Sequence, residues 1–193
     1  MVAELLENNH KVVVLDSLVK GHKEALLGGK LYVGDLRDRK ILDKVFTENK
    51  IDAVIDFAAF SLVGESMTEP LKYFNNNVYG TISLLEAMRD YNVKYIVFSS
   101  TAATYGEPER IPILESDRTE PTNTYGETKL SIEKMMKWPS KAHNLRYVAL
   151  RYFNACGAHI SGKIGEAHNP ETHLIPLVLQ VPLGKRPYIS IFG

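Results

Sequence analysis

The 193-residue sequence predicts an α/β fold built on a doubly wound parallel sheet. Short runs of β-branched and other apolar residues alternate with longer segments in which apolar residues recur at helical spacing. Connections of that length join parallel strands and place helices on both faces of the sheet. In addition, small or polar residues follow each strand-like run, at the edge where such sheets bind their ligands.

The first four elements are short. Residues 2–9 predict the end of a helix. Residues 11–16 (KVVVLD) form a β-branched run that ends in a carboxylate, as expected of a buried parallel strand. A shorter apolar run at 31–33 follows a polar loop and predicts a second strand. Residues 38–49 carry apolar side chains at helical spacing and predict a helix.

Three strands and two longer helices follow. Apolar runs that predict buried strands occur at residues 53–59 (AVIDFAA), 94–100 (KYIVFSS) and 147–153 (YVALRYF). The segments 70–91 and 124–138 have apolar residues at helical spacing and predict the helices that connect these strands.

Glycine and proline become frequent after residue 154. This change predicts a looped lid or the start of a second domain. We therefore expect one domain at residues 1–153 and the beginning of a substrate-binding region at residues 154–193. The last three residues, 191–193, form a strand-like run for which the sequence offers no partner.

Charge and cysteine content narrow the class of protein. Lysine plus arginine and aspartate plus glutamate number 23 each, so nothing favours nucleic acid or a membrane as a partner. The single cysteine, Cys156, excludes an intrachain disulfide and fits a reducing compartment. The apolar runs are too short to cross a bilayer, and the acidic start does not resemble a signal peptide. We therefore expect a cytoplasmic protein.

Tyr125 and Lys129 stand four residues apart on a predicted helix and therefore share a face. A cation beside a phenol favours the phenolate, which could then accept a proton from an alcohol. Such pairs also occur by chance on solvated helix faces. The preceding strand ends in hydroxyl residues at positions 99–101. There Thr101 could bind the same alcohol, although such residues also cap strands. Together the three side chains favour hydride transfer between an alcohol and a nicotinamide.

The chain resembles the extended short-chain dehydrogenase/reductase family and, within it, the UDP-glucose 4-epimerases. The resemblance covers nearly the whole chain. It rests on residues 63–66 (VGES), 75–81 (NNNVYGT), 98–106 (FSSTAATYG), 123–129 (NTYGETK), 151–154 (RYFN) and 173–176 (HLIP). It implies a Rossmann-like NAD-binding domain at residues 1–153. It also implies interconversion of UDP-galactose and UDP-glucose through a transient 4-ketose, with Tyr125 as base, Thr101 assisting and NAD exchanging the hydride.

The same resemblance implies the residues that bind the cofactor and the sugar. Asp16 would hold the adenosine ribose, although a carboxylate at a strand end can simply face water. The residues implied for NAD are Asp16, Ser17, Asp35, Leu36, Phe57, Ala58, Ala59, Ser61, Asn76, Tyr125, Lys129 and Phe153. Those implied for the nucleotide sugar are Thr101, Tyr125, Asn154 and His173. Asn75 and Asn77 would satisfy local backbone groups, and His173 could equally be an ordinary loop histidine.

Several alternatives to an epimerase share its fold. Sugar-nucleotide dehydratases need an acid/base pair beside the strand-end hydroxyl, where this chain has Ala102 and Ala103. Decarboxylases of the family often carry a glutamate there, and that residue is absent as well. A non-catalytic nucleotide-sugar-binding protein of the same fold is a further alternative. We predict no metal site, because His168 and His173 have no cysteine or third histidine at ligand spacing.

The sequence departs from the family in three places. It has no Gly-x-x-Gly-x-x-Gly loop, and its first residues resemble the second half of the helix that normally follows that loop. We therefore expect a chain truncated at both ends, with little activity on its own. Asp56 replaces a usual histidine, and Ser61 a frequent lysine. The resemblance also implies that full-length copies pair through the helices at 70–91 and 124–138 to form a homodimer.

Overall fold

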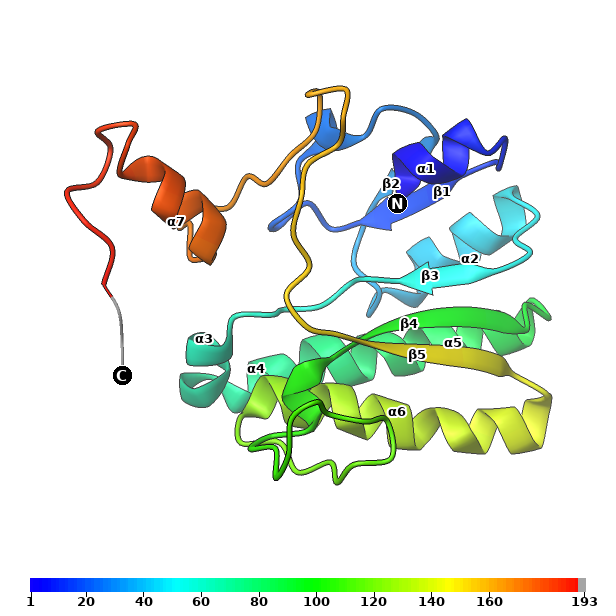
Figure 1. The fold of residues 1–193 in the computed structure, drawn as a ribbon. Helices are drawn as coiled ribbons and strands as arrows, with labels where there is room; N and C mark the ends of the chain where they lie inside the picture. The colour runs from blue at the N-terminus through cyan, green and yellow to red at the C-terminus, as the bar shows by residue number, and fades with distance from the viewer. Residues whose placement is uncertain (191–193) are drawn as a thin grey trace.

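The computed structural model describes residues 1–190 (Figure 1). In chain order the elements are α1 (Val2–Glu7), β1 (Val13–Asp16), the 3-10 helix η1 (Lys23–Ala25), β2 (Lys30–Val33), α2 (Arg39–Glu48), β3 (Val54–Asp56), α3 (Val63–Thr68), α4 (Pro70–Tyr73), the π-helical segment η2 (Phe74–Tyr79), α5 (Gly80–Asp90), β4 (Tyr95–Thr101), the 3-10 helix η3 (Ala102–Thr104), α6 (Thr124–His143), β5 (Arg146–Tyr152) and α7 (Leu174–Gln180).

All strand pairs are parallel, which confirms the predicted α/β class. The strands form two sheets, β1-β2 and β3-β4-β5, where the sequence predicted one. Among the described strands, β1 pairs with β2 and β3 pairs with β4, and no strand joins the two pairs by backbone hydrogen bonds. Side chains bridge the two sheets, since Leu15 of β1 packs against the core beneath β3 and β4. The described strands thus form two parallel sheets that share one core.

Helices α2, α5 and α6 cover one face of the β3-β4-β5 sheet (Figure 1). Their apolar side chains form one cluster with Ile96 and Phe98 of β4, both almost fully buried. On the opposite face of β5, Val148 is 54% exposed and Leu150 is 38% exposed. Within the described residues the main core therefore lies on one side of this sheet.

Most element boundaries agree with the predictions, with instructive exceptions. The strand predicted at 53–59 stops at Asp56, because its Oδ1 accepts a hydrogen bond from the Ala58 N–H and turns the chain. The helix predicted at 124–138 continues through Pro139 to His143 and ends at Asn144, whose φ is 58°. The segment 70–91 contains a π-helical stretch between two α-helical ones.

Two helices, α3 and α7, were not predicted. The strand-like run at residues 191–193 lies outside the part of the chain that the structure describes. Among the helices of residues 1–190, none combines the length and apolar character needed to cross a membrane.

Candidate active site

The predicted site residues gather at the carboxyl ends of the strands. In the larger sheet β3 ends at Asp56, β4 at Thr101 and β5 at Tyr152, and in the smaller sheet β1 ends at Asp16. Parallel strands place these ends at one edge of each sheet. In Figure 1 the ends of β3, β4 and β5 point toward the side of the molecule that carries α3.

The first turn of α6 is held in place from three directions. Asn123 caps the helix, its Oδ1 accepting a 2.8 Å hydrogen bond from the Gly126 N–H. The Tyr125 N–H donates to Ser66 Oγ on α3 across 3.1 Å. A Cβ on Gly126 would lie 2.7 Å from the carbonyl oxygen of Ala103, so only glycine allows this approach. The turn that carries Tyr125 is therefore locked against η3, which directly follows Thr101.

Lys129 is buried, with 2% of its surface exposed. Its Nζ donates a 2.8 Å hydrogen bond to the carbonyl oxygen of Ser99 and lies 4.8 Å from the centre of the Phe98 ring. The distance from Nζ to the centre of the Tyr125 ring is 6.0 Å. Burial lowers the pKa of Lys129 to about 8, and the carboxyl group of Asp56 opposes that shift. At neutral pH the side chain is still largely an ammonium ion.

Tyr125 is half-buried at this edge of the sheet. Burial raises the pKa of its phenol, and a hydrogen bond with the Thr101 side chain acts in the opposite direction. The sequence predicted that Lys129 would lower this pKa. In the structure Lys129 directs its ammonium to Ser99, and burial gives the Tyr125 pKa a net upward shift.

Asp56 is a residue of the site that sequence reasoning left without a role. It is 4% exposed, and its Oδ2 accepts a long 3.4 Å hydrogen bond from Thr81. Burial raises its pKa, and the charge of Lys129 counteracts this rise. The Asp56 carboxyl group thus supplies an opposite charge to the buried lysine.

The acids predicted to bind the adenosine end lie at the end of β1 and just after β2. Asp16 Oδ1 accepts a 2.7 Å hydrogen bond from the Leu18 N–H. A Cβ on Gly21 would stand 2.9 Å from both carboxylate oxygens, so the following loop closes tightly over this group. Asp35 is engaged by Arg37, which lowers the pKa of the carboxyl group. Its neighbour Leu36 packs against the core.

The three asparagines of the π-helical segment differ in their contacts. Asn77 is buried and exchanges two hydrogen bonds with the backbone of Phe60, at 2.9 and 3.0 Å. Asn75 accepts from the Arg37 side chain rather than from backbone groups, contrary to expectation. Asn76, predicted to contact the cofactor, lies between them and donates to Asn77. π-Helical turns often occur at functional sites, which fits the predicted role of Asn76.

The remaining predicted residues are mostly exposed. Phe57 is 49% and Phe153 61% exposed, so two aromatic rings stand open at the ends of β3 and β5. Beside Phe57, Ala58 and Ser61 are also exposed, and Ala59 is half-buried. Ser17 and Asn154 are exposed as well. The His173 ring faces other side chains of its own loop, with Nδ1 2.6 Å from Glu166 Oε1.

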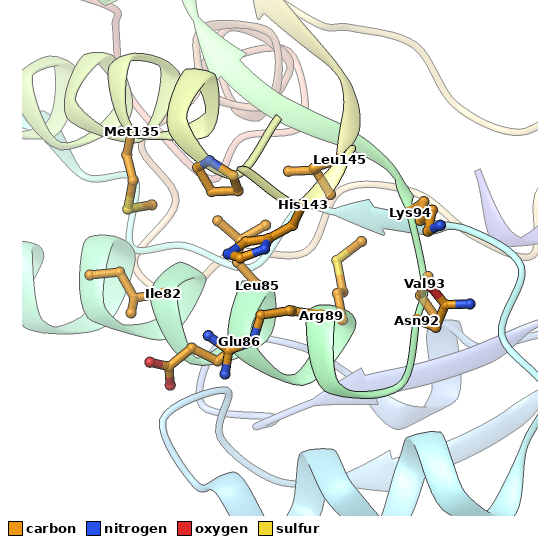
Figure 2. Close-up of a pocket in the computed structure, with 12 residues that line it drawn as sticks. Ile82, Leu85, Glu86, Arg89, Asn92, Val93, Lys94, Met135, His143 and Leu145 are labelled. Atoms are coloured by element: carbon orange, nitrogen blue, oxygen red, sulfur yellow. The ribbon is translucent and has the colours of Figure 1, made fainter. Parts of the chain in front are cut away.

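A cavity of about 180 Å³ lies elsewhere in the molecule (Figure 2). Its lining comes from α5, from the carboxyl-terminal half of α6 and from the residues that precede β4 and β5, among them Lys94 and Leu145. It therefore lies at the amino ends of these strands, opposite Tyr125, and takes no part in the candidate site.

Known proteins resemble this chain over its whole length. The model of the NAD dependent epimerase/dehydratase family matches residues 1–193. The UDP-glucose 4-epimerase of Halalkalibacterium halodurans is 60% identical over 189 residues, which cover 98% of this chain and 57% of that protein. The enzyme of the same name from Lacticaseibacillus casei is 54% identical, covering 100% of this chain and 58% of its own length.

Solved structures agree with these relatives. A crystal structure of a UDP-glucose 4-epimerase superimposes with a TM-score of 0.97 at 57% identity, covering 100% of this chain and 59% of that one. The Brucella ovis UDP-glucose 4-epimerase in complex with NAD gives a TM-score of 0.95 at 45% identity, with the same coverage. This chain thus spans 57–59% of the length of the proteins it matches. It belongs to the NAD dependent epimerase/dehydratase family.

Proposed function

We propose that the protein containing this chain is a UDP-glucose 4-epimerase that acts in the cytoplasm on UDP-glucose and UDP-galactose. The observation that carries this proposal is the placement of Tyr125, Thr101 and Lys129 at one strand edge. The Thr101 side chain counteracts the rise in the pKa of the phenol, and the buried ammonium lies 6.0 Å from the centre of the phenol ring. The name shared by the relatives supplies the substrate class.

The residues present fit NAD. Asp16 uses Oδ1 for its own turn, which leaves Oδ2 as an acceptor for a ribose hydroxyl. The exposed rings of Phe57 and Phe153 provide apolar surface at the strand ends. We propose these residues for the cofactor, together with Ser17, Asp35, Leu36, Ala58, Ala59, Ser61, Asn76, Tyr125 and Lys129. When bound, NAD would accept a hydride from the sugar and return it.

The chain's own residues would move the proton and hold the groups in place. Tyr125 takes the proton from the sugar 4-hydroxyl and later returns it, and Thr101 holds that hydroxyl. An ammonium has three N–H donors, and Lys129 uses one on Ser99. Its two remaining donors and its positive charge would favour the phenolate once the site is occupied.

The residues beside Thr101 favour epimerisation over dehydration. Ala102 and Ala103 form η3 immediately after Thr101, and neither side chain can transfer a proton. We propose Asn154 and the segment that begins at His173 for contacts with the nucleotide sugar. Residues 1–153 would then form the NAD-binding part, and residues 154–193 the start of the sugar-binding part. Two full-length copies would pair through α5 and α6.

Replacement of Tyr125 by phenylalanine tests the proposal in the full-length protein. We expect conversion of UDP-galactose to UDP-glucose to fall by about 10²–10⁴-fold, the usual contribution of a general acid–base group. UDP affinity should stay close to that of the wild type. Tyr95→Phe, which alters a 55% exposed tyrosine at the other end of β4, is the matched control. Wild-type turnover in Tyr125→Phe would refute the assignment.

The 193-residue chain alone should bind NAD weakly. Its sequence contains no Gly-x-x-Gly-x-x-Gly loop to present backbone N–H groups to the pyrophosphate. Isothermal titration of NAD into the chain and into the full-length protein measures the difference. Equal affinity in both would show that the loop is unnecessary.

A further inference from the structure

Four metal-ligating side chains converge in the loop that leads from β5 to α7. They are Glu166, His168, Glu171 and His173, and one ligand atom from each lies within 4.8 Å of the others. Two are imidazoles and two are carboxylates, and they alternate along eight residues of loop. We propose that these four residues bind one divalent transition-metal ion, with Zn²⁺ as the best match.

Most of the distances between the ligand atoms are close to those around a tetrahedral ion. A metal with ligands at about 2.0–2.1 Å has ligand–ligand edges of about 3.3–3.4 Å. The two Nδ1 atoms of His168 and His173 are 3.3 Å apart. His173 Nδ1 lies 2.6 Å from Glu166 and 3.4 Å from Glu171. His168 Nδ1 lies 3.8 and 3.7 Å from the same two carboxylates. Four of these five distances, 3.3 to 3.8 Å, lie within about 0.5 Å of the tetrahedral edge, and the 2.6 Å contact between His173 and Glu166 would lengthen when the ion binds.

The chemistry of the four groups agrees with this geometry. A neutral imidazole offers one acceptor nitrogen, and here both rings turn Nδ1 toward the same point. A cation between the two rings would be bound by both Nδ1 atoms at once. Two carboxylates supply two negative charges, which a divalent ion neutralises. Imidazole nitrogen selects zinc and its neighbours over magnesium or calcium.

Further contacts orient these ligands. Glu171 Oε1 accepts hydrogen bonds from the backbone N–H groups of Thr172 and His173, both at 2.8 Å. The Glu171 side chain is only 14% exposed. The His22 ring, from the loop after β1, lies 2.8 Å from the carbonyl oxygen of Ala167, between two of the ligands. Outer hydrogen bonds of this kind fix the orientation of metal ligands.

The ion would have a structural role. Four protein ligands close a tetrahedral zinc site and leave no position for substrate or water. His173 is the N-cap residue of α7, so the ion would tie the start of this helix to the preceding loop. The hydrogen bond of His22 connects the same loop to the segment after β1. The site uses none of the catalytic side chains Thr101, Tyr125 and Lys129, and it shares only His173 with the segment proposed for the nucleotide sugar.

Zinc binding by the purified 193-residue chain tests the proposal. After removal of metals with a chelator, incubation with Zn²⁺ and dialysis, we expect one Zn²⁺ per chain by atomic emission. Co²⁺ in its place should give the intense visible bands of a tetrahedral complex. His168→Ala and His173→Ala should each weaken Zn²⁺ binding by about 10–100-fold or more, since even outer-shell changes cost that much. Competition with a chromophoric chelator measures the affinity.

Matched variants separate this site from other zinc ligands. His159→Ala removes a histidine of the same loop whose ring faces one carboxylate, Glu7, at 3.6 Å. Cys156→Ser removes the exposed thiol. Both should bind Zn²⁺ like the wild type. Glu166→Gln keeps the shape of the side chain but removes its charge, and it should weaken Zn²⁺ binding. This variant therefore tests the site even if an alanine variant misfolds. Binding that persists in the His168→Ala/His173→Ala double variant, or is lost in Cys156→Ser, would overturn the proposal.

Discussion

The backbone N–H of Tyr125 donates a 3.1 Å hydrogen bond to the hydroxyl oxygen of Ser66, 59 residues earlier in the chain. Ser66 has no exposed surface, and its own hydroxyl donates to the carbonyl oxygen of Val63 at 2.7 Å. One buried side chain therefore joins α3 to the first turn of α6. That turn carries the proposed base, so α3 contributes to the geometry of the site without touching the reacting groups.

Ser66→Ala should destabilise the chain by about 1–3 kcal/mol, the usual cost of leaving a buried N–H without a partner. Urea denaturation followed by circular dichroism measures the change. Ser61→Ala removes an exposed serine from the loop between β3 and α3 and should alter stability by at most about 0.5 kcal/mol. A Ser66→Ala chain as stable as the Ser61→Ala control would show that the bond to Tyr125 contributes nothing.

The buried ammonium of Lys129 should make stability depend on alkaline pH. Its pKa is lowered from 10.5 to about 8 in the folded chain. Between these values the unfolded chain holds a proton that the folded chain has released, so stability rises with pH. The full rise corresponds to roughly 3 kcal/mol. Above pH 10 the raised pKa values of Tyr73 and Tyr125 also affect stability, so the window to examine is about pH 8–10.

Urea midpoints measured across that window, with Lys129→Met as the variant, test this dependence. The methionine has no charge to bury, and its stability should stay nearly constant where that of the wild type rises. Lys134→Met removes an exposed lysine from the same helix and should keep the wild-type slope. An unchanged slope in Lys129→Met would mean that other groups cause the dependence.

The fold class and the placement of Thr101, Tyr125 and Lys129 at one edge of the sheet could be predicted because both depend on local patterns. Alternating strand and helix periodicity predicts parallel strands, and parallel strands place Asp16, Asp56 and Thr101 at sheet edges. The spacing of Tyr125 and Lys129 places both on one face of α6. These features need no knowledge of which distant segments meet.

The features that the sequence did not predict depend on distant contacts or on irregular backbone. Ser66 meets Tyr125 only in the folded chain. The burial of Asp56 cannot be inferred because its strand, Val54–Asp56, is too short to show an alternation of apolar and polar residues. Helix α3 contains Gly64, a poor helix former, which hides it from propensity arguments. In α7, Pro176 had a similar effect, although the first turn of a helix tolerates proline.

The cluster around His173 escaped prediction for another reason. Common zinc motifs combine histidines with cysteine or with a further histidine. Here the side chains beside His168 and His173 are instead the glutamates at 166 and 171. Their spacing has no regular period, because the segment is a loop whose turns decide which side chains meet. Counting carboxylates as ligands identifies the candidates from the sequence, though not their convergence.

Arg151→Met should cost roughly 3 kcal/mol, because it leaves a buried carboxylate without its partner. Arg151 Nη2 lies 2.7 Å from Glu133 Oε2, and the Glu133 side chain is 11% exposed. The Ser100 hydroxyl donates to the same carboxylate, so the network joins β4, β5 and α6. Denaturant titration at neutral pH measures the loss.

A surface ion pair provides the control for Arg151. Arg39 lies 2.8 Å from Asp43 on α2 and 2.7 Å from Asp90 at the end of α5, and all three side chains are 38–42% exposed. Arg39→Met should cost at most about 1 kcal/mol. Equal losses in the two variants would mean that burial of Glu133 adds nothing to the strength of its pairing.

Two glycines in helices should respond in opposite ways to alanine. A Cβ on Gly64 in α3 would have no neighbour within 4 Å, whereas a Cβ on Gly126 would stand 2.7 Å from the Ala103 carbonyl oxygen. Gly64→Ala should stabilise the chain by about 0.5–1 kcal/mol, because alanine favours helix. Gly126→Ala should destabilise it by about 1–3 kcal/mol, the usual cost of overpacking. Thermal and urea unfolding of both variants measure the contrast.

The Gly126 substitution should also affect turnover in the full-length protein. Gly126 follows Tyr125, and Ala103 lies two residues after Thr101, so the backbone shift that relieves the clash also separates these two side chains. Full-length Gly126→Ala should therefore convert UDP-galactose more slowly than the wild type, while Gly64→Ala should keep the wild-type rate. Equal stabilisation by both substitutions would show that the contact between α6 and η3 is looser than its geometry indicates.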